Sequence, residues 1–173
     1  NGLTLEPQGR LVVCAQCDRA IMRIEKDGTR TTLADRYDGK RLNGPNDLVV
    51  KKNGVVYFTD PSISLRGGNN SGFKELPFNG VFLVKDGKVT LIEKEIAAPN
   101  GIALSIDEKY LYVGGGGIKR YEVQPDDTAI NPKPFFDQGC DGLKLDQRSN
   151  VYCVNRGALW ILSPEGRHRG IIV

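Results

Sequence analysis

The chain has 173 residues, of which 39% are hydrophobic, and it contains 21 glycines and carries a formal net charge of +3. This length suffices for one domain with a hydrophobic core. Lysine and arginine are scattered among acidic residues without a basic stripe, and no apolar run approaches the length of a membrane span. We therefore expect neither nucleic acid nor a membrane as the partner.

A segment that opens with an amide or carboxylate side chain recurs four times along the chain. In each copy aliphatic residues follow two and four positions later, and a polar turn and a second apolar run come next. A period of two predicts a strand with one buried face. The copies begin at Asn1, Asn46, Asn100 and Asp141. Third strands are expected from Ala20, Gly80, Gly117 and Ala158, and fourth strands from Thr29, Lys88, Pro132 and Arg169.

The spacing of the copies, about 40–55 residues with four short strands in each, is typical of β-propeller blades. Asp-Gly pairs, as at Asp86-Gly87, supply the positive φ that tight hairpins need. No helical periodicity extends beyond a turn. We predict an all-β fold, a single β-propeller domain over residues 1–173. The approximate blades are 1–40, 41–96, 97–138 and 139–173.

One connection is much longer than the others. It runs from Ser62 to Pro77 with the sequence SISLRGGNNSGFKELP, which is polar and rich in glycine and asparagine. Long loops on a rigid scaffold are usually either functional or disordered, so a functional loop and a mobile surface loop both stay open.

The side-chain oxygens that open the four repeats suggest a shared site. If the repeats form blades, these oxygens can meet at one point, and oxygen ligands suit a hard cation. Asparagine and aspartate before glycine also favour turns and cap strand starts, which is the purely structural alternative.

The four cysteines do not complete a metal site. Cys14 and Cys17 have the spacing of a zinc or redox pair, but Cys140 and Cys153 do not, and His168 is the only histidine. We expect separate cysteines in or near blade strands, with Cys153 in the core. The cysteines leave the redox compartment open.

Four stretches of the chain read RLNGPNDLVVKKNGVVYFTDP, KELPFNGVF, APNGIALSIDEKYLYV and CDGLKLD. These stretches resemble the gluconolactonase family, which groups the senescence marker protein regucalcin, bacterial gluconolactonases and related lactonases. The resemblance implies a six-bladed propeller with one divalent metal, commonly calcium, with zinc, magnesium and manganese as alternatives. It makes Asn46, Asn100 and Asp141 the metal ligands. The family's fourth ligand, a glutamate of the first blade, has no counterpart here.

The resemblance also implies that four blades of six are present. Asn1 falls inside a strand and is not methionine, so we expect the natural N-terminus and any targeting information to be missing. Open apolar blade faces would then favour either additional chain or self-association. The compartment stays undetermined.

Together with the resemblance, the ligand types favour a metal-dependent hydrolase of sugar lactones, a gluconolactonase-like enzyme. Asp141, the only carboxylate among the repeat positions, is the candidate to orient or deprotonate the attacking water. Asn1, Asp47 and Asp60 are candidates for substrate binding. Asp47 could instead bond neighbouring backbone, and Asp60 could brace the loop that follows it. The alternatives are an organophosphate or ester hydrolase with the same metal site, and a non-catalytic propeller that binds a protein or a carbohydrate.

Overall fold

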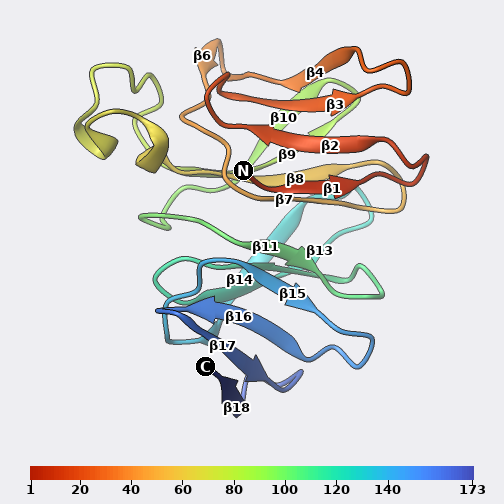
Figure 1. The fold of residues 1–173 in the computed structure, drawn as a ribbon, viewed down its shortest axis with the longest axis vertical. Helices are drawn as coiled ribbons and strands as arrows, with labels where there is room; N and C mark the ends of the chain where they lie inside the picture. Colours follow the sequence, from red (N-terminus) through yellow and green to blue (C-terminus); the bar gives the residue numbers. More distant parts are fainter. The chain divides into compact units, whose positions relative to one another are not determined.

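The computed structural model describes residues 1–173, and nearly all of its regular structure is β-strand (Figure 1). Four four-stranded antiparallel sheets each follow the chain as a meander, as predicted for blades. The first sheet comprises β1 (Leu3–Leu5), β2 (Leu11–Ala15), β3 (Ala20–Ile24) and β4 (Arg30–Ala34). The second comprises β7 (Leu48–Val50), β8 (Val56–Asp60), β9 (Gly80–Lys85) and β10 (Lys88–Glu93).

The third sheet comprises β11 (Ile102–Leu104), β12 (Tyr110–Val113), β13 (Ile118–Val123) and β14 (Ala129–Phe136). The fourth comprises β15 (Leu143–Leu145), β16 (Val151–Asn155), β17 (Ala158–Leu162) and β18 (His168–Ile172). Most predicted strands are found within a residue of their expected starts. The fourth strand of the third sheet is an exception, since it begins at Ala129 and not at Pro132. No helix in the chain is long or apolar enough to cross a membrane.

Tight turns join neighbouring strands at two Asp-Gly pairs. Asp86 and Gly87 connect β9 to β10 with φ of 50° and 74°, so both central residues have the positive φ of a primed turn. The same geometry, with φ of 50° and 75°, closes a small hairpin that the sequence analysis did not predict. This hairpin pairs β5 (Arg36–Tyr37) with β6 (Lys40–Arg41).

The chain divides into two compact units, Asn1–Pro99 and Asn100–Val173, each holding two blades. In the first unit every residue of β8 is buried, because side chains pack on both faces of this strand. Phe58 of β8 stacks on Phe82 of β9 with ring centroids 5.4 Å apart, and Tyr37 packs against Phe82 at 5.1 Å. Buried residues of the first two sheets form one continuous core.

The second unit has its own core, which joins the third and fourth sheets. Tyr112 meets Phe135 edge-on at 5.0 Å, and Phe136 packs against Trp160 at 5.7 Å. These aromatic pairs add to the burial of apolar area that stabilises the unit.

The long connection between β8 and β9 has internal structure. It contains two short 3-10 turns, Ser62–Ser64 and Gly68–Asn70. The Ser62 main-chain nitrogen donates to the side-chain oxygen of Asn79 at 3.0 Å, and the Asn79 amide donates to Asn69 at 3.0 Å. The Asn79 side chain therefore ties the two ends of this loop to each other and to its middle.

Candidate functional site

The residues that open the four repeats share one backbone arrangement. Each donates its main-chain nitrogen to a carbonyl at the end of the second strand of its own blade. These pairs are Asn1–Cys14 (3.0 Å), Asn46–Thr59 (2.8 Å), Asn100–Gly114 (3.0 Å) and Asp141–Val154 (2.8 Å). A return bond joins the next residue of each repeat to the same partner. The predicted equivalence of the four positions within their blades is thus confirmed.

Neighbouring first strands approach each other at these positions. In the first unit the Gly2 nitrogen donates to the Asn46 carbonyl at 2.7 Å, and Figure 1 shows β1 beside β7. In the second unit the Gly101 nitrogen donates to the Asp141 carbonyl at 2.6 Å. A Cβ atom on Gly101 would lie 2.4 Å from that carbonyl oxygen. Glycine follows Asn1 and Asn100 because the neighbouring strand leaves no room for a side chain there.

In the first unit, Asn46 and Asp47 lie where β7 begins. Asn46 is only 8% exposed, and its main-chain nitrogen and oxygen are both bonded. A side-chain oxygen of Asp47 accepts the Leu48 main-chain N–H at 2.9 Å. The same oxygen would lie 2.5 Å from a Cβ on Gly2. Asp47 thus faces the join between β1 and β7, where it bonds neighbouring backbone.

Asp60 ends β8 and is completely buried. One carboxylate oxygen accepts the Asn43 main-chain N–H at 2.8 Å, and the other accepts that of Gly44 at 2.7 Å. Burial, the largest influence, raises the pKa of Asp60 to about 7. The two N–H donors and the positive charges of Arg19 and Lys74 act in the opposite direction, since they stabilise the carboxylate.

Asn43 is a buried polar residue that the sequence analysis missed, because it lies outside the repeated segment. Its side-chain nitrogen donates to the carbonyls of Asp60 and Phe78, both at 3.0 Å, while its side-chain oxygen is buried without a hydrogen-bond partner. A Cβ on the adjoining Gly44 would lie 1.8 Å from the Ser64 hydroxyl oxygen. The long loop therefore packs directly on the segment before Asn46.

In the second unit, Asp141 is exposed and Asn100 is half-buried. The expectation of separate cysteines is wrong for one pair, because Cys140 and Cys153 form a disulfide with their Cα atoms 5.7 Å apart. Cys153 pairs with Leu143 of β15, and Cys140 lies three residues before Leu143, so the disulfide crosses from β16 to the segment that precedes β15. The disulfide fixes the residue directly before Asp141. Cys14 is buried, Cys17 is exposed, and neither is in a disulfide.

The donor chemistry of the repeat positions suits a hard cation. No group of three or more His, Cys, Asp or Glu side chains that could hold a metal ion occurs in residues 1–173. The predicted ligands are instead two amides and one carboxylate, Asn46, Asn100 and Asp141. Neutral amide and anionic carboxylate oxygens are the donors that calcium and magnesium take in proteins. These residue types therefore fit such an ion.

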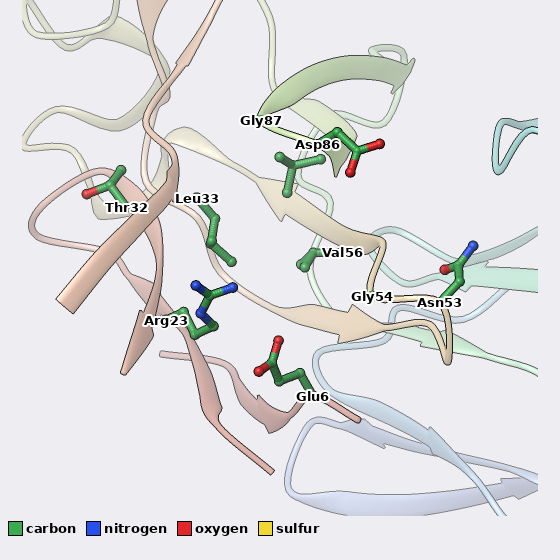
Figure 2. Close-up of a pocket in the computed structure, with 10 residues that line it drawn as sticks. Glu6, Arg23, Thr32, Leu33, Asn53, Gly54, Val56, Asp86 and Gly87 are labelled. Carbon is green, nitrogen blue, oxygen red and sulfur yellow. The ribbon is translucent and has the colours of Figure 1, made fainter. Parts of the chain in front are cut away.

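The first unit has a pocket with a volume of about 340 Å³ (Figure 2). Asn1 and Asn46 precede β1 and β7, whereas Glu6 and Asn53 of the pocket follow the same strands. The pocket is thus at the opposite strand ends. Its lining residues are Glu6, Arg23, Thr32, Leu33, Asn53, Gly54, Val56, Val84, Asp86 and Gly87.

The four blades and the repeated strand starts define a β-propeller, and solved structures support this class. A gluconolactonase structure from Xanthomonas campestris matches with a TM-score of 0.88 and 32% identity over 99% of this chain and 61% of the other. A structure of the calcium-binding protein regucalcin from Agrobacterium tumefaciens matches with a TM-score of 0.65 over 99% of this chain and 72% of the other. At 17% identity, this second likeness shows the fold alone.

Within that class, the chain belongs to the SMP-30/gluconolactonase/LRE-like family, whose model matches residues 1–173. A gluconolactonase of Zymomonas mobilis is 37% identical over 190 aligned residues, which include 99% of this chain. The match spans 53% of that protein, so the chain covers about half the length of this relative. The resemblance stated from the sequence is thereby confirmed.

Proposed function

We propose that the full-length protein is a lactonase that hydrolyses a sugar lactone with the help of one divalent cation. The observation that supports this most is the placement of Asn46, Asn100 and Asp141. They occupy the same backbone position in successive blades of a chain that belongs to the gluconolactonase family. Amide and carboxylate oxygens repeated at one position of a fold suit the binding of a single ion better than the capping of four unrelated turns.

The proposed ligands are the side-chain oxygens of Asn46, Asn100 and Asp141. Two neutral amides and one carboxylate give a site of low negative charge that suits calcium, and calcium, the metal that the family resemblance implies most often, is our first choice. Zinc, magnesium and manganese are the alternatives. When bound, such an ion polarises the carbonyl of a lactone and stabilises the negative charge that develops on its oxygen.

Asp141 has the role of orienting water and accepting its proton. Its carboxylate is exposed, so water can reach it, and the backbone bond to Val154 and the disulfide at Cys140 fix its main chain. As the oxygen of water bonds to the carbonyl carbon, the ring C–O bond breaks and the proton passes to the leaving ring oxygen, which yields a hydroxy acid. A lactone is reactive enough for a weak base to assist.

The three candidates for substrate binding differ in their surroundings. Asn1 is exposed at the equivalent position of the first blade, so we retain it as a residue that contacts the substrate. Asp47 and Asp60 bond backbone groups through their carboxylates, and a supporting role suits both better than direct contact.

The test is hydrolysis of glucono-1,5-lactone by the full-length protein, corrected for spontaneous ring opening. We expect turnover that chelation abolishes and that added calcium restores. Unchanged turnover after exhaustive chelation would rule out assistance by a metal. Turnover of an organophosphate or a simple ester in place of the lactone would favour the ester hydrolase, and the absence of any turnover in the metal-loaded protein would favour a binding propeller.

A further inference from the structure

The strongest unassigned feature is the buried carboxylate of Asp60. It accepts two consecutive main-chain N–H groups, one on each oxygen, from Asn43 at 2.8 Å and Gly44 at 2.7 Å. Its own carbonyl accepts the Asn43 side-chain amide at 3.0 Å. Three hydrogen bonds thus join one residue at the end of β8 to two residues that precede Asn46.

These bonds begin where the strand ladder ends. The pairing of β7 with β8 starts at Leu48 and Phe58, and the Asn46–Thr59 bond extends it by one step. Beyond that step no strand carbonyl reaches the N–H groups of Asn43 and Gly44, and the Asp60 side chain takes its place. Because buried N–H groups need acceptors, this carboxylate determines the path of the backbone into Asn46.

The arrangement is specific to one blade. The residue that follows the partner of each repeat position is Ala15 in the first blade, Gly115 in the third and Asn155 in the fourth. Only the second blade has a carboxylate there. If Asp60 served the blade fold in general, the other blades would need an equivalent group. We therefore connect the Asp60 carboxylate with a segment that belongs to the second blade, namely the residues that lead into Asn46.

We propose that Asp60 is a positioning residue, which holds the backbone of Asn43 and Gly44 and so places the side-chain oxygen of Asn46 for cation binding. This inference rests on the proposed function, in which Asn46 is a ligand. Asp60 itself does not touch the substrate, because its side chain is fully buried and both oxygens are occupied.

The test compares calcium affinity in the full-length protein and its variants by isothermal titration calorimetry at pH 8. Asp60→Asn keeps the shape but replaces one acceptor by an N–H donor that faces another donor. We expect calcium to bind roughly 10-fold or more weakly, the loss typical when support of a metal ligand is removed. We also expect kcat to recover toward the wild-type value at saturating calcium.

The matched control is Val84→Ala. Val84 is buried in the same blade near the opposite end of the strands, so its truncation destabilises the unit without touching the segment before Asn46. We expect Val84→Ala to lower the melting temperature and leave calcium affinity unchanged. Equal calcium affinity in Asp60→Asn and Val84→Ala would overturn the inference, since Asp60 would then matter only for stability.

The variant Asn46→Ala distinguishes the ligand role of Asn46 from the positioning role of Asp60. If it weakens calcium binding while Asp60→Asn does not, only the role of Asp60 is wrong. If Asn46→Ala itself keeps full affinity, Asn46 is not a ligand, and both the ligand set and the role of Asp60 fail.

A measurement on the wild type covers the case in which Asp60→Asn does not fold. Hydrogen exchange of residues 43 and 44 should be slow and should slow further with calcium. Exchange as fast as in the exposed turn at residues 52–54, with or without calcium, would show that the carboxylate does not hold this segment.

Discussion

The titration of Asp60 should leave a measurable pH dependence in the stability of the protein. Its folded-state pKa is about 7, against an ordinary value of 3.8, because burial disfavours the charged form. Between pH 4 and pH 7 the unfolded chain therefore loses this proton while the folded protein keeps it. The contribution to stability is complete below about pH 4, falls as the pH rises, and levels off above about pH 7.

The size of the effect follows from linkage. Each pH unit in this window changes the free energy of unfolding by about 1.4 kcal/mol for one proton. From pH 4.5 to pH 7.5 we expect Asp60 to reduce the stability of the wild type by roughly 3 kcal/mol. In Asp60→Asn this contribution is absent, and the groups whose pKa values Asp60 raises are the cations Arg19 and Lys74 rather than other carboxylates.

The assay is urea unfolding followed by circular dichroism, with wild type and Asp60→Asn compared at pH 4.5 and pH 7.5. The wild type should lose stability relative to the variant as the pH rises. Subtracting the two proteins removes the contribution of the other carboxylates. A difference in stability that is the same at both pH values would refute the reasoning, because Asp60 would then titrate at its ordinary pKa or not at all in this range.

Four further predictions concern the candidate site and its supports. Asp141→Asn should lower kcat by roughly 100-fold or more at saturating metal, and wild-type turnover would show that Asp141 is not the catalytic carboxylate. Asn100→Ala should weaken calcium binding in calorimetry and change kcat at saturating calcium much less; an unchanged Kd removes it from the ligand set. Replacing Cys140 and Cys153 together by serine should cost about 3 kcal/mol in urea unfolding, and dithiothreitol should destabilise the wild type but not this variant. Gly101→Ala should lower the melting temperature because its Cβ would lie 2.4 Å from the Asp141 carbonyl oxygen. Gly116→Ala is the control, since a Cβ there would have no atom within 4 Å, and equal melting temperatures of the two variants would contradict the close approach at Gly101.

The two segments that lead into Asn46 and Asp141 are supported by different chemistry. Asp60 holds the first through hydrogen bonds, and the disulfide at Cys140 holds the second through a covalent bond. Both act directly before the residue proposed as a ligand, where the strand ladder of the blade has ended.

The sequence alone determined the blades, because a meander is built from neighbouring strands joined by short turns. Two features could be interpreted without a structure, namely the period-two alternation after Asn46 and Asn100 and the turn at Asp86-Gly87. Both depend only on local preferences. The equivalence of the repeat positions followed from the same regularity. The family resemblance then proposed a role for their side chains.

Tertiary structure alone decided what those positions are surrounded by. The Cys140–Cys153 disulfide, the contact that excludes a side chain at Gly101 and the buried pair of N–H groups at Asp60 each join residues through space. Spacing along the chain does not encode burial, and burial is what raises the pKa of Asp60 and makes its two acceptors indispensable. A residue type shows which chemistry is available, but only the fold sets the solvent and partners that decide how it is used.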